Sequence, residues 1–168
     1  MADPLAYCGP LFRALNPAYA REPMSGRGAE LYGGRFNAKG TPALYTSLSI
    51  RTALGEAHQA GRFQPLTLVS YEAEIEHIFD GRDGDGLATA GLEPSALADP
   101  GWRDRMRADG EAPTQGLARR LIASGHHGLL VRSFAPGAGA GDLNLVLWRW
   151  GDAAPARLTL VDDEKRLR

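Results

Sequence analysis

Hydrophobic and polar positions divide the chain into short segments with two kinds of spacing. Residues 66–75 alternate between apolar and polar and extend toward Ile78, which predicts the most regular strand. Shorter apolar runs bounded by turn-forming residues predict further strands. These runs span residues 11–15, 43–46, 128–131, 143–150 and 156–161.

A helix is predicted directly after the second of these short strands. Ser47 or Ser49 can cap its N-terminus, and Gly61 lies just past its end. Its apolar face is formed at helical spacing by Ile50, Ala53, Leu54 and Ala57. Glu56 lies two residues from Leu54, a rotation of about 200°, so its carboxylate borders this face and can point into the edge of a cleft.

The second half of the chain contains one clear helical segment and one weaker one. Residues 114–124 have helical spacing with Gly125 as a stop signal, whereas residues 94–109 are weakly helical and are interrupted by Pro100 and Gly101. Segments rich in turn formers predict loops at residues 16–40, 80–86 and 136–141. Because strands and helices follow one another without regular βαβ alternation, the sequence predicts an α+β fold with a largely antiparallel sheet.

Length and composition favour one compact domain over residues 1–168. The chain has a mass of 18.0 kDa and 43% hydrophobic residues, enough for a sizeable core. No apolar run reaches the roughly 18–20 residues needed to cross a membrane, and the first residues lack the features of a secretion signal. Cys8 is the only cysteine, so it can form neither an internal disulfide nor a cysteine zinc site. We therefore expect a cytoplasmic protein without a membrane partner or a bound metal.

Charge is distributed unevenly along the chain. Residues 1–70 and 116–168 each have a net charge of +3, residues 71–115 have −7, and the total is −1. Arginine makes up 17 of the 19 basic residues. A GC-rich genome favours arginine codons, but the guanidinium group also binds phosphate through paired hydrogen bonds. The basic parts permit a phosphate-bearing ligand, whereas the near-neutral total argues against direct binding of nucleic acid.

Three residues in the first third of the chain are candidates for binding or catalysis. Arg35 follows two glycines that let a ligand approach the backbone, and it either holds a phosphate or faces solvent from a tight turn. Tyr45 lies on a short apolar strand and is either a core residue or a platform for a ligand ring. Glu56 is either a solvated helix residue or the carboxylate of a site. None of the three is diagnostic alone.

Taken together, a set of short motifs between residues 11 and 150 resembles the RES-domain family in order and spacing. The motifs are Phe12-Arg13, Gly33-Gly34-Arg35-Phe36-Asn37, Leu44-Tyr45-Thr46-Ser47, Ala53-Leu54-Gly55-Glu56, Val131-Arg132-Ser133 and Asn144. The chain departs from the family pattern at Phe36, where tryptophan is common, and at Phe12, where tyrosine is common. Arg132 stands where proline often precedes the serine.

The resemblance implies a fold like that of the diphtheria-toxin group of ADP-ribosyltransferases and a role as a ParT-like toxin of a bacterial toxin–antitoxin pair. It implies NAD+ as the substrate, cleavage of the nicotinamide–ribose bond and transfer of ADP-ribose to a cytoplasmic target protein. Water or phosphate as the acceptor, which would deplete NAD+, is an alternative. Another class of protein, a module that binds phosphate or a partner without catalysis, is a further alternative. The expected partner is a helical, DNA-binding antitoxin that occludes the cleft.

The resemblance also implies roles for individual residues. Glu56 is expected to stabilise the oxocarbenium-like ribose, and nicotinamide leaves as a neutral molecule, so no strong general acid is needed. The expected NAD+-binding residues are Arg13 and Arg35 for the diphosphate, Tyr45 for the nicotinamide ring, Ser133 for the ribose or the carboxamide, and Asn37 and Asn144 for ordering the loop or contacting the ligand.

Overall fold

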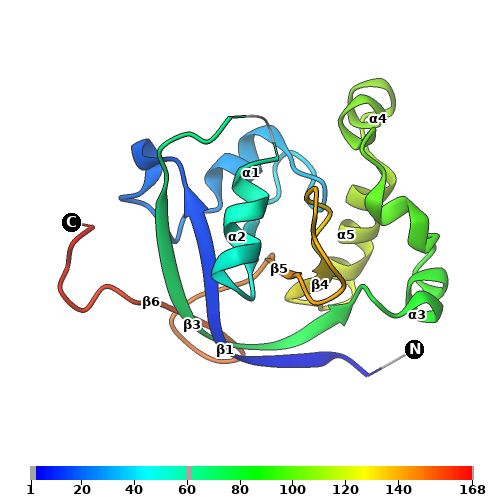
Figure 1. The fold of residues 1–168 in the computed structure, drawn as a ribbon. Coiled ribbons are helices and arrows are strands. Elements are labelled where there is room, and N and C mark those ends of the chain that lie inside the picture. Colours follow the sequence, from blue (N-terminus) through cyan, green and yellow to red (C-terminus); the bar gives the residue numbers. More distant parts are fainter. Residues whose placement is uncertain (1–2, 60–61, 168) are drawn as a thin grey trace.

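The structure is a computed structural model that describes residues 3–59 and 62–167 (Figure 1). Its strands are β1 (Leu5–Leu15), β2 (Leu44–Ser47), β3 (Thr67–Asp80), β4 (Gly128–Arg132), β5 (Leu143–Leu147) and β6 (Ala156–Leu160). Its α-helices are α1 (Arg27–Tyr32), α2 (Ile50–Ala57), α3 (Gly84–Thr89), α4 (Trp102–Asp109) and α5 (Pro113–Ala123). Two 3-10 helices, η1 (Pro17–Tyr19) and η2 (Pro94–Ala98), lie between them.

The strands form one mixed sheet in the order β1-β2-β5-β4-β3-β6. β1 also pairs with β3 along most of its length, so the pairings from β1 through β2, β5, β4 and β3 return to β1. The β1–β2 junction rests on a single pair, Phe12 opposite Ser47. Among the strands of the described residues, β3 and β4 form the one parallel pair. The expected α+β fold with a mainly antiparallel sheet is therefore confirmed.

Two apolar clusters hold the sheet to the rest of the chain. Alternation along β3 turns Val69, Tyr71, Ala73 and Ile75 into the first cluster, where they pack with residues of β1, β2, β5 and β6. The second cluster joins β4 and β5 to α3, η2 and α5, with Leu117 and Leu129 fully buried. The segment from α3 to α5 thus has its own core, which is joined to the sheet.

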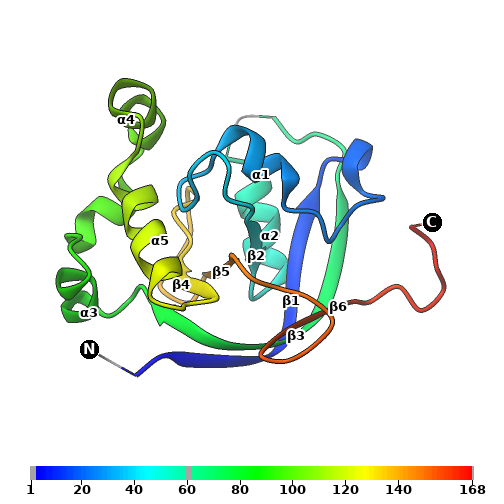
Figure 2. The same cartoon turned by 180° about the vertical axis from the view of Figure 1, so that it is seen from behind.

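The helices lie in two groups. Figures 1 and 2 show α2 alongside β1 in the middle of the molecule, with α1 next to it, and α3, α4 and α5 on the side away from the C-terminus. Ser49 caps α2, because its side chain accepts a hydrogen bond of 3.1 Å from the backbone N–H of Thr52. Thr52 and Ala53 face inward from α2. In the part of the chain described, no helix has the length and hydrophobicity that a membrane crossing requires.

The structure corrects the expected boundaries of α2 and its inward face. The helix ends at Ala57 with His58 as its C-cap, and the predicted stop, Gly61, lies outside the described residues. Ile50 and Ala57 are exposed instead of buried. The inward face rotates toward Thr52 because the hydroxyl of that residue has a partner, donating a hydrogen bond of 2.8 Å to Asp142.

The predicted strand over 143–150 is also too long. Hydrogen bonding to β4 ends at Leu147, and the N–H of Trp148 instead donates to the carbonyl of His127. Trp148 and Trp150 therefore do not share one strand face. Their indole N–H groups donate to different loops, to the carbonyls of Phe36 and Met24 respectively, at 2.8 and 2.9 Å.

Two predicted loops contain helices. The segment 16–40 includes η1 and α1, and α3 begins at Gly84 inside the loop predicted over 80–86. Asp83 caps α3 with its side chain, which accepts a hydrogen bond of 3.1 Å from the N–H of Asp85. Burial of Leu87 in the second cluster outweighs the poor helix propensity of the glycines.

Candidate active site

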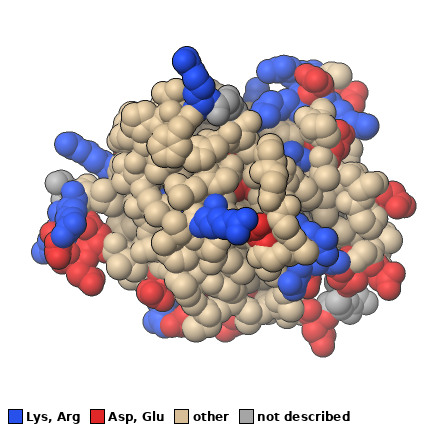
Figure 3. Space-filling view, in the orientation of Figure 1, with Lys and Arg blue, Asp and Glu red and all other residues tan. Residues whose placement is uncertain are grey.

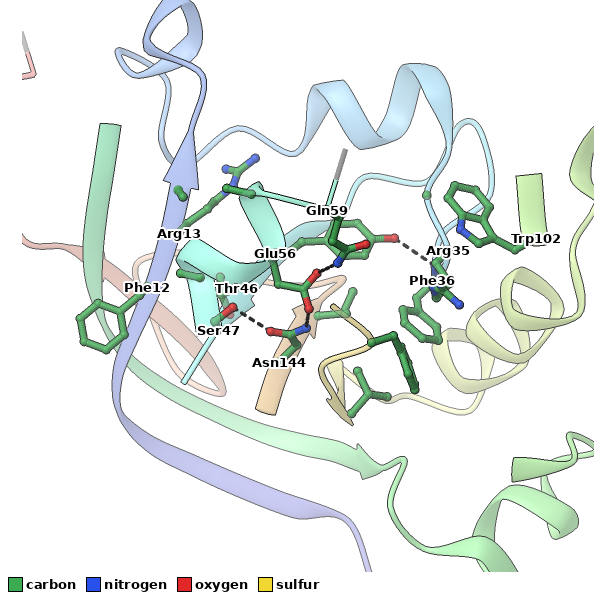
Figure 4. Close-up of a pocket in the computed structure, with 18 of the residues that line it drawn as sticks. Phe12, Arg13, Arg35, Phe36, Thr46, Ser47, Glu56, Gln59, Trp102 and Asn144 are labelled. Atoms are coloured by element: carbon green, nitrogen blue, oxygen red, sulfur yellow. Dashed lines mark hydrogen bonds between the residues drawn. The ribbon is translucent and has the colours of Figure 1, made fainter. Parts of the chain in front are cut away.

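A pocket of about 460 Å³ opens where β1, β2, β4 and β5 meet α2 and the loop after α1. This volume is in the range of small-molecule sites, about 300–1,000 Å³. Glu56, Arg35 and Tyr45, which come from three different elements, all line it. Figure 4 shows Glu56 near the middle of the pocket, with Arg13 and Arg35 on opposite sides of it.

The carboxylate of Glu56 accepts hydrogen bonds from three side chains. Its Oε1 atom accepts from the amide Nδ2 of Asn144 at 2.6 Å and from the hydroxyl of Ser133. Its Oε2 atom accepts from the amide of Gln59, one turn further along the chain. A half-buried carboxylate held in this way has a fixed orientation toward the pocket.

Strand register explains why Asn144 reaches Glu56. Asn144 on β5 lies opposite Ser47 on β2 and opposite Val131 on β4. The hydroxyl of Ser47 donates a hydrogen bond of 2.7 Å to Oδ1 of Asn144. The NH₂ group of the same amide points toward Glu56 and donates to its carboxylate (Figure 4). Ser133 follows β4 directly and completes the arrangement.

Tyr45 is fixed by the loop after α1. Its hydroxyl accepts a hydrogen bond of 3.0 Å from the N–H of Phe36 and donates one of 2.6 Å to Oδ1 of Asn37. Burial raises the pKa of Tyr45, so the residue stays a neutral phenol. A Cβ atom at Gly34 would collide with this hydroxyl, which explains the glycine at that position. The ring can therefore present one face to a ligand while its polar end is occupied.

Asn37 does not line the pocket. It is fully buried, and its amide Nδ2 donates to the carbonyls of Ala29 and Thr41 at 2.8 and 2.9 Å. Asn37 was expected either to order the loop or to contact the ligand. Its geometry fits the first role, ordering of the loop.

Arg35 is half-buried and tethered to the segment before α4. Its Nη1 atom donates to the carbonyls of Leu97 and Asp99, both at 2.9 Å, and its guanidinium lies 5.1 Å from the ring centre of Phe134. Burial lowers the pKa of Arg35; Glu56 raises it again, and Arg103 lowers it. The Arg35 guanidinium therefore lies within electrostatic range of both Glu56 and Arg103.

Arg13 reaches the pocket from β1. Its Nη1 atom donates to the carbonyl of Pro23 at 3.3 Å, and the hydroxyl of Tyr71 donates to the same oxygen at 2.6 Å. Burial raises the pKa of Tyr71, and the positive charge of Arg13 opposes that rise.

Several residues that line the pocket were not predicted from the sequence as site residues. Ser47 belongs to a quoted motif, and Gln59 has the helical spacing i+3 from Glu56, so both could have been found from their neighbours. Trp102, Arg103 and Phe134 come from segments far away in the sequence, and only the fold brings them to the pocket. Within 3–59 and 62–167, no three His, Cys, Asp or Glu side chains form a group that could hold a metal ion.

Comparison with known proteins identifies the family. The model of the RES domain matches residues 10–168, so the chain belongs to the RES-domain family. No curated protein matches the chain. A chain in the crystal structure of the M. tuberculosis MbcT–MbcA toxin–antitoxin complex has a similar fold, with a TM-score of 0.67 and 19% sequence identity. The match covers 95% of this chain and 84% of that chain.

Proposed function

We propose that the chain is a bacterial toxin that cleaves the nicotinamide–ribose bond of NAD+ and transfers ADP-ribose to a cytoplasmic target protein. The observation that carries the proposal is the carboxylate of Glu56, held by Asn144 and Ser133 in a pocket that Arg35 and Tyr45 also line. Membership in the RES-domain family supports it.

Glu56 has the chemistry that the first half of this reaction requires. When the C–N bond breaks, its electron pair leaves with the ring nitrogen, and nicotinamide departs as a neutral molecule. The anomeric carbon of the ribose becomes oxocarbenium-like and positive. A carboxylate that is already oriented stabilises that charge, and it also accepts a hydrogen bond from a ribose hydroxyl. The nucleophile then adds to the anomeric carbon and loses its proton.

The other lining residues fit the remaining parts of NAD+. Tyr45, which is partly exposed and lines the pocket, supplies an apolar face for nicotinamide. Arg13 and Arg35 supply positive charge on either side of Glu56 for the diphosphate. Asn144 lines the pocket beside the carboxylate, where a ribose hydroxyl would be, whereas Ser133 is buried and contacts the carboxylate without lining the pocket.

We infer a cognate antitoxin as the partner, a helical protein that binds DNA and occludes the pocket. The similarity to a chain of a toxin–antitoxin complex supports such a partner. The pocket opens at the surface, so a second protein can reach Glu56 from outside.

Incubation of the purified chain with NAD+ tests the proposal. We expect nicotinamide release by the wild type, and a loss of at least about 100-fold in Glu56→Gln, because the neutral amide cannot stabilise the positive ribose. Nicotinamide is measured by liquid chromatography, and ADP-ribose added to candidate proteins by intact mass. Glu93→Gln, an exposed residue that does not line the pocket, is the matched control and should keep full activity.

The same experiment separates the alternatives. A mass increase on a target protein supports ADP-ribose transfer, whereas free ADP-ribose or ADP-ribose phosphate as the sole product indicates NAD+ depletion. If the wild type leaves NAD+ intact, the chain is a binding module and the proposed reaction is wrong. If Glu56→Gln stays as active as the wild type, the assigned role of Glu56 is wrong.

A further inference from the structure

The first turn of α4 forms one end of the pocket. Trp102 and Arg103 both line it, and the guanidinium of Arg103 lies 4.5 Å from the ring centre of Trp102. Figure 4 shows Trp102 beside Arg35, on the same side of Glu56. Trp102 is buried, so it gives the long side chain of Arg103 a fixed surface to stack on.

The start of α4 and the loop that carries Arg35 are joined by several contacts. Arg35 donates to the carbonyls of Leu97, in η2, and Asp99, at the end of η2, in the segment that leads into α4. The buried amide of Gln115 donates to the carbonyl of Gly34 at 2.9 Å and also contacts the sulfur of Met106 on α4 at 3.1 Å. Arg35 and Arg103 are therefore held at the same end of the pocket by the fold itself.

Neither guanidinium has an acidic partner. In the described part of the chain, no carboxylate oxygen lies within 4.0 Å of Arg35 or Arg103. The carboxylate of Asp99 is engaged elsewhere, with Arg105 at 3.0 Å and the N–H of Gly101 at 2.8 Å. Figure 3 shows basic and acidic side chains interspersed over α4. Arg35 is half-buried and Arg103 is exposed, and neither forms an ion pair in the part of the chain described. Their positive charges repel each other, and an anion between them offsets that repulsion.

We infer that Arg103, together with Arg35, forms a binding site for the diphosphate group of a dinucleotide or nucleoside diphosphate. The inference rests on the proposed function, in which the ligand is NAD+. It adds Arg103 to the binding residues and specifies which end of the pocket holds the diphosphate. The diphosphate lies at the α4 end of the pocket. This placement assigns the diphosphate to Arg35 and Arg103 and not to Arg13, which lies on the opposite side of Glu56. The ribose that reacts then lies at Glu56.

Calorimetric titration with ADP tests the inference without any turnover. We expect Arg103→Ala to weaken ADP binding by about tenfold or more, since a charge-assisted hydrogen bond to phosphate is lost. Arg107→Ala is the matched control: Arg107 is on the same helix, is exposed and does not line the pocket, so the change should stay below about twofold. Arg103→Lys keeps the charge but loses the paired donors, and it should give an intermediate affinity.

Adenosine serves as the second probe, because it lacks the phosphates. Arg103→Ala should leave adenosine binding unchanged. The inference is overturned if the wild type does not bind ADP, if Arg103→Ala binds it as well as the wild type, or if ADP and adenosine weaken equally.

The result is separable from the test of the proposed function. Suppose that nicotinamide release depends on Glu56 but ADP binds Arg103→Ala as well as the wild type. The proposed function would then stand, and the diphosphate site at Arg103 would be rejected. If instead ADP binding depends on Arg103 but NAD+ is not cleaved, the diphosphate site would stand and the proposed reaction would be rejected.

Discussion

Asn144 can bind Glu56 productively in only one orientation of its amide. With Nδ2 toward Glu56 the amide donates, whereas with Oδ1 toward Glu56 two oxygens would face each other. The carboxylate of Glu56 can only accept, so it sets the first orientation, and the hydroxyl of Ser47 holds the amide there by donating to Oδ1 at 2.7 Å. Ser47 is buried and acts on the carboxylate through Asn144, so it is a positioning residue.

Replacement of Ser47 by alanine should therefore lower the rate of NAD+ cleavage without removing a catalytic group. We expect kcat to fall by about tenfold, which corresponds to the loss of one net hydrogen bond, while KM changes little. Ser47→Thr keeps a hydroxyl and should recover much of the rate. Nicotinamide release at varied NAD+ concentration measures both constants.

The exposed Ser95, which does not line the pocket, provides the matched control. Ser95→Ala should behave as the wild type. A Ser47→Ala variant whose kcat is unchanged, or one in which only thermal stability falls, would contradict the positioning role.

At the scale of single residues, the sequence identified the parts of the pocket that come from motifs. Arg13, Arg35, Tyr45, Glu56 and Asn144 all line it, as the motifs led us to expect. Whether they bind NAD+ stays a prediction. Arg103 could not be found in this way, because its place depends on how α4 packs against a loop about 70 residues earlier, and nothing local encodes that packing.

At the scale of elements, α2 carries Glu56 and is fixed at its first turn. The hydroxyl of Ser49 caps the helix and contacts that of Thr52 at 2.8 Å. Thr52 in turn donates to Asp142, in the loop before β5. A hydrogen bond from the N–H of Gly139, and next the one from Thr52, lower the pKa of the Asp142 carboxyl, which stays charged. The position of α2 is thus linked to the strand that carries Asn144.

Removal of the side-chain cap of α2 should lower the stability of the protein more than its catalytic rate. Ser49→Ala is expected to lower the free energy of unfolding by about 1 kcal/mol, because the N–H of Thr52 loses its acceptor. Ser49→Asp retains an acceptor and should stay close to the wild type. Urea denaturation followed by circular dichroism measures the difference, and equal midpoints for Ser49→Ala and the wild type would contradict the assigned cap.

Elements with regular spacing were predictable, and those stabilised by distant contacts were not. Alternation in β3 and the spacing in α5 gave these elements nearly their observed bounds. β1 begins at Leu5, six residues before the predicted start, because Gly9 and Pro10 interrupt the pattern although pairing with β3 continues through them. Likewise α3 forms around Leu87, whose burial depends on tertiary packing.

At the scale of the whole molecule, His127 joins three parts of the chain. Its Nδ1 atom lies 2.8 Å from the carbonyl of Glu76 on β3, which makes Nδ1 the protonated nitrogen. Its own carbonyl accepts from the N–H groups of Trp148 and Arg149. Burial lowers the pKa of His127, and the positive charge of Arg149 and the neighbouring His77 lower it further, although the bond to Glu76 opposes them.

This lowered pKa predicts how stability depends on pH. Below the ordinary histidine value of about 6.5, the unfolded chain binds a proton at His127 that the folded protein does not. The free energy of unfolding should therefore fall as the pH is lowered from about 7.5 to about 5.5, by at most about 1.4 kcal/mol per pH unit from this residue. Above this range its contribution is fully present.

Comparison with His127→Asn isolates the effect, because asparagine has no titratable group. Its amide can also donate to Glu76 in place of Nδ1. Urea unfolding of both proteins at the two pH values should show a smaller loss of stability in the variant. Equal losses would mean that His127 does not titrate differently on folding.

The groups that hold Glu56 in place are widely separated along the chain: Ser133 lies 77 residues and Asn144 lies 88 residues after it. A ribosome therefore produces the carboxylate long before it produces the donors that orient it. A nascent or truncated chain that ends before β5 lacks the finished arrangement, whatever reaction the pocket performs. The site therefore cannot form before the ribosome has produced β5.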